Sequence, residues 1–191
     1  QEAIRRLQTS SARYYQRPGS GLPYDTSGTK LSGMGASFEI GKGSKGHWRY
    51  SEEVVIRTPG LEFNDLGFMN LANTIENDTR LSYVEKENKW IFKDYKVSLS
   101  QENTWNLQGK GLGYGLEMDA DFNFRNHWAL FFGAEYKTGI MDEQRLRGGP
   151  SIREPDQLHY MAGMNTKKKK KFYFSLFAMY MYRITANFHF F

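Results

Sequence analysis

The chain has 191 residues, and 26 Lys and Arg against 21 Asp and Glu give it a formal net charge of +5. It contains no cysteine, which excludes disulfide frameworks, thiolate metal sites and cysteine nucleophiles. A mean hydropathy of −0.67 excludes a helical membrane protein, because no run approaches the roughly 18 apolar residues that a spanning helix needs. Aromatic residues at 16% and 19 glycines are high for so polar a chain, and they favour many short strands with tight turns.

Alternation of apolar and polar residues predicts β-strands along most of the chain, because successive side chains of a strand point to opposite faces. In chain order, the predicted strands are residues 31–41, 47–57, 79–84, 95–107, 114–125, 128–137, 158–165 and 172–183. Weaker alternation at 12–16 and 184–191 would add two strands, for about eight to ten in all. No segment has the pattern of a helix.

The clearest alternation spans residues 114–125. One face would carry Tyr114, Leu116, Met118, Ala120, Phe122 and Phe124, and the other Gly115, Glu117, Asp119, Asp121, Asn123 and Arg125. A helix could not use this pattern, because its period of 3.6 would scatter the apolar residues around the circumference.

Short links alternate along the chain with longer loops, of which the two longest are predicted at 58–78 and 138–157. Outer-membrane barrels have short periplasmic turns and longer extracellular loops, and strands of about ten residues match their spanning length. Trp48, Tyr114, Trp128 and Tyr136 are predicted at strand ends, where interfacial aromatic residues lie. The fold class predicted is therefore an all-β, antiparallel transmembrane β-barrel, with residues 1–191 as one domain. The alternative is a soluble barrel whose apolar face points inward.

Two motifs carry a family resemblance. Residues 57–68, RTPGLEFNDLGF, resemble a recurring Ser/Thr-Pro-Gly-Phe-Glu-hydrophobic-Asn-Asp-Leu-Gly-Phe signature. Residues 146–155, LRGGPSIREP, are similar to a Leu-Arg-Gly-Gly-Pro-x-x-Arg-x-Pro motif of the same family. The family is the C-terminal outer-membrane β-barrel domain of unknown function in Bacteroidetes-type proteins whose N-terminal part resembles a family 9 carbohydrate-binding module.

The resemblance implies a bacterial outer-membrane location and an association with carbohydrate, and it transfers no catalytic residue. Barrels of this family continue for many strands beyond the Arg-Gly-Gly-Pro motif. Residues 172–191 also run strand into strand without a turn residue. We therefore expect the chain to be part of a larger barrel.

The two long loops are the first candidate site, because loops of this length in a compact domain are usually functional. Their polar side chains could bind sugars or a partner protein. The candidate loop residues are Arg57, Glu62, Asn64, Asp65, Arg145, Arg147 and Arg153. The alternative is that the loops fold over the barrel mouth and seal it.

The polar strand faces are the second candidate site, a charge network that would line the barrel lumen. Its predicted members are Arg49, Glu53, Arg80, Lys96, Glu117, Asp119, Asp121, Glu135 and Lys137. Glu117, Asp119 and Asp121 lie about 7 Å apart at successive steps on one strand face, a spacing that could also suit a calcium or sugar contact, or a glycosidase pair. Ion pairing is the preferred interpretation, because barrel lumens are rich in paired charges.

Other motifs give no support for a cofactor, a metal or nucleic acid. Residues 41–46 match G-x-G-x-x-G, but a dinucleotide site needs a helix after this motif and a strand is predicted. The four histidines are predicted to be scattered at strand ends, without metal-ligand spacing. Lys167 to Lys171 are predicted to form a hairpin turn at a membrane edge, although a lysine run can also bind nucleic acid.

The function expected is an outer-membrane barrel, without enzyme activity, that anchors or assists a surface glycan-handling protein, with transport through a polar lumen as one route. The alternatives are a scaffold for other envelope proteins and a barrel hydrolase, for which no Ser-His-carboxylate set can be assembled. The expected partners are outer-membrane lipid, glycans and other outer-membrane or surface proteins. No cofactor, metal or nucleic acid is expected.

Overall fold

The computed structural model describes residues 2, 27–30, 32–61, 71–143, 145–146, 150–166 and 172–184. All ten elements in these ranges are strands. They are β1 (Gly35–Lys42), β2 (Trp48–Arg57), β3 (Thr74–Glu85), β4 (Phe92–Trp105), β5 (Gly111–Phe124), β6 (Ala129–Thr138), β7 (Met141–Asp142), β8 (Ile152–Arg153), β9 (Asp156–Asn165) and β10 (Ser175–Ile184). None of the described residues belongs to a helix with the length and apolar character needed to cross a membrane.

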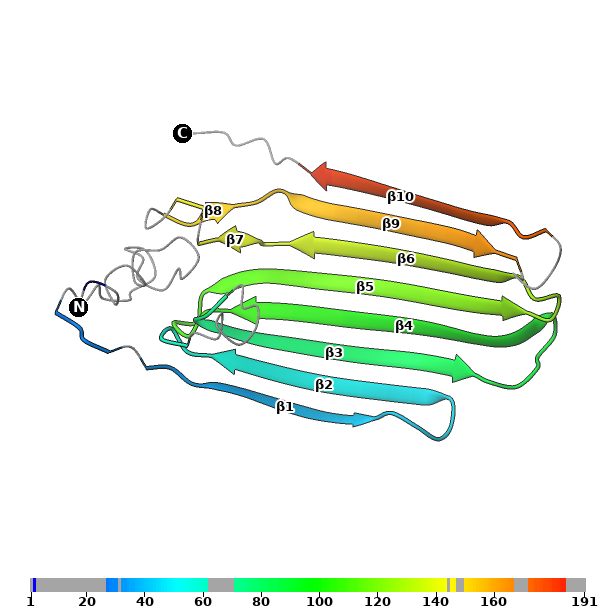
Figure 1. The fold of residues 1–191 in the computed structure, drawn as a ribbon, viewed down its shortest axis with the longest axis horizontal. Coiled ribbons are helices and arrows are strands. Elements are labelled where there is room, and N and C mark those ends of the chain that lie inside the picture. The colour runs from blue at the N-terminus through cyan, green and yellow to red at the C-terminus, as the bar shows by residue number, and fades with distance from the viewer. Residues whose placement is uncertain are drawn as a thin grey trace.

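The eight long strands form one antiparallel sheet in the order β1-β2-β3-β4-β5-β6-β9-β10. Figure 1 shows them side by side in a single layer, with β1 and β10 at the two edges. The sheet is open and is not closed into a barrel. The short strands β7 and β8 pair with each other between β6 and β9.

The eight main predicted strands all correspond to long strands of this sheet, and their boundaries need correction. The structure starts β3 at Thr74 and β9 at Asp156, so the two long loops are shorter than predicted and span 58–73 and 139–155. The second loop also contains β7 and β8. The prediction missed the start of β3 because the polar residues Asn77 and Thr79 occupy positions where the alternation requires apolar side chains. The weaker prediction at 12–16 lies outside the described residues, and so does the one at 184–191 except for Ile184, which is the last residue of β10.

The connections at one end of the sheet are short, and this end is called the turn end below. It holds the links 43–47, 86–91, 125–128 and 166–174, on the right in Figure 1. Residues 41–46 comprise the last two residues of β1 and most of the link to β2, so the G-x-G-x-x-G motif is followed by a strand, as predicted. The opposite end, called the loop end, holds the two long loops and the short link 106–110, which breaks the predicted alternation of loop lengths.

One face of the sheet, called the apolar face below, carries rows of aliphatic and aromatic side chains. The register aligns Tyr50, Leu81, Leu99 and Met118 across β2 to β5. The same row continues through Ala134, Tyr160 and Tyr180 on β6, β9 and β10. Six of these seven residues, all except Ala134, are large, and all six are exposed.

Aromatic rings gather at the turn end of the apolar face. Tyr83 contacts Trp48 edge-on at 5.2 Å between ring centroids and stacks on Tyr95 at 6.0 Å. Phe92 lies 5.6 Å from Tyr95 and 5.5 Å from Phe122. Trp48 therefore lies in an aromatic cluster at a strand end, as predicted, and its place at a membrane interface stays a prediction.

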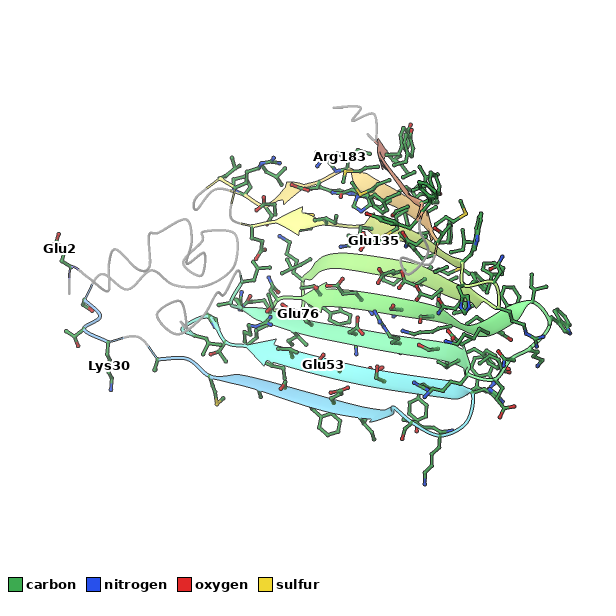
Figure 2. The ribbon with its side chains drawn as sticks, turned by 45° about the vertical axis from the view of Figure 1, so that its right-hand side comes forward. Glu2, Lys30, Glu53, Glu76, Glu135 and Arg183 are labelled. Carbon is green, nitrogen blue, oxygen red and sulfur yellow. The ribbon has the colours of Figure 1, made fainter. Side chains whose placement is uncertain are left out.

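The opposite face, called the polar face, carries the charged and small residues from β1 to β6. Glu53, Glu76 and Glu135, labelled in Figure 2, belong to it and come from β2, β3 and β6. Its character changes toward β10, where Phe177 stacks on Phe131 with ring centroids 6.0 Å apart. The polar face is thus polar over most of the sheet and aromatic near one edge.

Burial in this sheet is inverted relative to a water-soluble domain. Among the described residues, the buried hydrophobic side chains are Leu61, Ala72 and Ala120. The buried polar or charged residues are Asn73, Thr74, Ser82, Glu85, Ser98, Ser100 and Asn106. Soluble domains bury the hydrophobic stripe or face of each element against another element. In this sheet the small polar-face residues Thr74, Ser82, Ser98 and Ser100 are buried, whereas large side chains of the apolar face are exposed.

Candidate functional site

All nine residues predicted to form a charge network lie on the polar face. They are Arg49 and Glu53 on β2, Arg80 on β3, Lys96 on β4, Glu117, Asp119 and Asp121 on β5, and Glu135 and Lys137 on β6. Strand alternation accounts for the shared face, because every member occupies the polar phase of its own strand. That this face lines a lumen stays a prediction.

Ion pairs join part of this set. Glu135 is the centre, with one carboxylate oxygen 2.8 Å from Lys137 Nζ and the other 2.8 Å from His159 Nδ1. Glu117 Oε2 lies 3.8 Å from Arg80 Nη2, a looser contact between half-exposed groups. One tight pair therefore lies within β6, the other connects β6 to β9, and the loose pair links β3 to β5.

His159 was predicted to lie at a strand end, and this prediction is wrong. The residue lies inside β9 and faces Glu135 in the register. Its Nε2 atom is buried and has no hydrogen-bond partner in the described structure. The sequence contains only a weak signal for this pair, because the contact depends on how β6 and β9 align.

A row of carboxylates crosses four strands of the polar face. The register places Glu39 opposite Glu53, Glu53 opposite Asp78, and Asp78 opposite Glu102. Like charges directly opposite each other destabilise a sheet. Of the four, only Glu53 was predicted as a site residue, because the polar phase of each strand can be deduced from the sequence but its register cannot.

Gly115 ends this row and makes room for a counter-charge. Gly115 lies opposite Glu102 on β4 and opposite Lys137 on β6. A Cβ atom at Gly115 would meet the Glu102 carboxylate at 3.6 Å and Lys137 Cε at 3.9 Å. Because Gly115 has no side chain, the space between Glu102, the last carboxylate of the row, and Lys137 stays open.

The three successive carboxylates of β5 face different surroundings. Glu117 lies between Ser100 and Glu135 in the register, and Asp119 lies between Ser98 and Gly133. Asp121 lies opposite Lys96 on β4. No group of three His, Asp or Glu residues in the described ranges is placed to hold a metal ion.

In the first family-like motif, Thr58 connects the loop end of β2 to the segment before β1 by hydrogen bonds. Thr58 Oγ1 accepts a hydrogen bond from Met34 N at 2.7 Å and donates to Met34 O at 3.0 Å. The backbone N of Thr58 also donates to Met34 O at 3.0 Å. A Cβ atom on Gly60 would collide with the Ser32 carbonyl oxygen. Threonine and glycine in this motif thus have a structural role, which is to lock two backbone segments together.

The described part of the second motif contains β8 and is connected to the β4–β5 link. Glu154 N donates to Ile140 O at 2.9 Å beside the β7–β8 pair. Lys110 Nζ lies 3.1 Å from Glu143 Oε1 and also donates to Ser151 Oγ. These bonds connect the link 106–110 to the loop 139–155 at the loop end.

The three candidate loop residues that the structure describes, Arg57, Arg145 and Arg153, each pair with a different carboxylate. Arg57 is the last residue of β2 and donates to Glu76 on the polar face. Arg145 pairs with Glu154 at 3.3 Å, and Arg153 lies 3.9 Å from Asp156. Glu62, Asn64, Asp65 and Arg147 lie outside the described residues. The described arginines are therefore engaged in ion pairs within the protein.

A cavity of about 420 Å³ opens at the loop end. Its lining combines the carboxylates of Asp142, Glu143 and Glu154 with apolar side chains such as Leu112 and Ile140. A smaller cavity of about 170 Å³ shares Leu112 and Ile140 with it. The sequence did not predict this cavity, because its walls come from four separate segments.

Comparison with known proteins gives one finding. No curated protein and no solved structure matches the chain. A family model described as a domain of unknown function, DUF5916, matches residues 8–189, so the chain belongs to the DUF5916 family.

Proposed function

We propose that this chain is part of a transmembrane β-barrel in a bacterial outer membrane, where it anchors or assists a surface glycan-handling protein. The inverted burial of the sheet carries the proposal. Tyr50, Leu81, Leu99 and Met118 form an exposed row, whereas Ser98 and Ser100 on the other face are buried. A barrel in lipid needs this arrangement, with apolar side chains outward and polar side chains inward.

A soluble barrel fits these observations less well. Closing this sheet with the apolar face inward would place the polar face, with its buried serines, in water. A soluble sheet would otherwise need a second layer on its apolar face. Large exposed apolar patches mark membrane or protein contacts. The aromatic cluster around Tyr83 also suits the interface between lipid and water, where amphipathic rings gather.

Support for the glycan role comes from the motif resemblance and from the ends of the sheet. The described residues of the family-like motifs, 57–61, 146 and 150–155, lie at the loop end. In outer-membrane barrels the longer loops are extracellular. The loop end would then face the cell exterior, where a surface glycan-handling protein works.

A scaffold for other envelope proteins is the second candidate, and a polar patch on the apolar face favours it. Glu52 accepts hydrogen bonds from Asn77 Nδ2 and Thr79 Oγ1, both at 2.5 Å. Gln101 and Asn103 extend the patch across β4 in the same register rows. Polar side chains facing lipid are costly, so this patch is suited to a protein neighbour.

The proposal is tested on the full-length protein purified from outer membranes. Electrophoretic mobility is compared with and without boiling, and single-channel conductance is recorded in planar bilayers. Heat-modifiable migration is expected, because a closed β-barrel resists detergent until it is heated. Conductance with block by added sugars would support transport through the interior.

Two outcomes would change the conclusion. Heat-modifiable migration without conductance, together with co-purifying envelope proteins, would favour the scaffold. A protein that is soluble without detergent and migrates identically before and after boiling would contradict the membrane proposal.

A further inference from the structure

A basic cavity lies on the polar face toward the turn end. Its volume is about 460 Å³, and its charged lining residues are Lys42, Arg49, Arg80, Lys96 and Glu39. The register places Arg49, Arg80 and Lys96 on the polar face of β2, β3 and β4, whereas Lys42 ends β1 opposite Tyr50. This lining contrasts with the acidic lining of the cavity at the loop end.

Small side chains beneath the cations create this cavity. Ser82 lies opposite Arg49 on β2 and opposite Ser98 on β4. Ser82 Oγ donates to Ser98 Oγ at 3.1 Å, and both residues are buried. Long basic side chains can lie over such a floor while their charged ends stay accessible.

Two cations of this cavity, Arg49 and Lys96, have no ion-pair partner among the described residues. Within the described structure, neither Arg49 nor Lys96 has a carboxylate within 4.0 Å, and the pair between Arg80 and Glu117 is loose at 3.8 Å. Arg49 Nε is buried without a hydrogen-bond partner, and so is Ser100 Oγ. Ser100 lies opposite Arg80 in the register. Buried donors without partners cost free energy, and a bound oxyanion would satisfy them.

The carboxylates of β5 border the basic cavity on its far side. Asp121 lies opposite Lys96, and Asp119 lies opposite Ser98. A ligand at this border would meet cations on one side and carboxylates on the other. A sugar acid matches both, because its carboxylate pairs with Arg and Lys and its hydroxyl groups donate to Asp.

We propose that Arg49, Arg80 and Lys96 bind the oxyanion group of an anionic sugar on the polar face. This site rests on the proposed function, in which the polar face lines the interior of the barrel, and it names the ligand class admitted there. The shared chemistry is an oxyanion, supplied by a sugar carboxylate or by a phosphate group.

The test uses the full-length protein in detergent and isothermal titration calorimetry. Glucuronate, glucose and inorganic phosphate are the probes, and the variants are Arg49→Gln, Lys96→Gln and Lys96→Arg. Lys93→Gln is the matched control, because it removes the same charge from an exposed residue of the same strand. Heat-modifiable migration of each variant reports whether it folds.

Glucuronate is expected to bind more tightly than glucose. Arg49→Gln and Lys96→Gln should each weaken glucuronate about tenfold or more, the loss typical of one charge-assisted hydrogen bond. Lys96→Arg and Lys93→Gln should retain binding. Displacement of glucuronate by phosphate would support a site for oxyanions from either source, and resistance to phosphate would support a site restricted to sugar acids.

Equal binding of glucose and glucuronate would overturn the proposal, and so would glucuronate binding unchanged in Arg49→Gln and Lys96→Gln. Calorimetry does not depend on conductance, so the two proposals fail separately. Glucuronate binding by a protein that shows no barrel behaviour would support the anion site and contradict the membrane role. A heat-modifiable barrel that binds no glucuronate would support the membrane role and contradict the anion site.

Discussion

The two faces of the sheet obey different rules. The apolar face is made of rows such as Tyr50, Leu81, Leu99 and Met118, which stay exposed. The polar face depends on specific partners, as in the contacts of Glu135 with Lys137 and His159. The comparison teaches that the two faces of one alternating strand pattern can be specified in different ways. The apolar face needs only side chains that are apolar, whereas the polar face needs specific residues placed so that their side chains can pair.

The largest expected effect comes from placing a charge on the apolar face. Met118→Arg should cost about 2–4 kcal/mol if this face meets lipid at mid-depth, and it should reduce the heat-modifiable form. The matched control is Glu102→Arg on the polar face. The new arginine would lie opposite Asp78, at the end of the carboxylate row that also contains Glu39 and Glu53. The yield of heat-modifiable protein after refolding into lipid vesicles checks both. Equal losses in the two variants would remove the distinction between the faces.

A smaller effect is expected from added volume. Gly163 is buried on the polar face, and a Cβ atom there would collide with the Phe131 ring. Gly163→Val should therefore destabilise the protein by about 1–3 kcal/mol, as overpacking usually does. The neighbouring Ala162 is exposed on the apolar face, and Ala162→Val should change stability little. Urea unfolding of the vesicle-inserted protein measures both, and a larger loss in Ala162→Val would contradict the face assignment.

The smallest effect separates tight from loose ion pairs within the polar face. Glu135→Gln should cost about 1 kcal/mol, because it weakens contacts to Lys137 and His159 at 2.8 Å. Glu117→Gln should cost about 0.5 kcal/mol or less, because its contact with Arg80 is half-exposed and 3.8 Å long. The same urea titration compares the two. A larger loss for Glu117→Gln would mean that its interactions matter more than the geometry indicates.

The candidate site was predicted unevenly. Membership of the polar face followed from alternation, so Arg49, Lys96 and Asp121 were assigned correctly to one face. Their grouping into a basic part on β2 to β4 and an acidic part on β5 needed the order of the strands. The loop prediction was weaker, because Arg57 belongs to β2 and pairs with Glu76. Loops carry no periodic signal, so their side-chain partners cannot be deduced from spacing.

The strand content, the antiparallel connections and the division into two faces were determined by the sequence itself, because a period of two is a local property of the chain. Only the tertiary structure decided the carboxylate row from Glu39 to Glu102 and the hydrogen bonds between Thr58 and Met34. These contacts join residues far apart in the chain. They depend on the register between strands and on close approaches of the backbone, and both are set by hydrogen bonds between segments that no local pattern encodes.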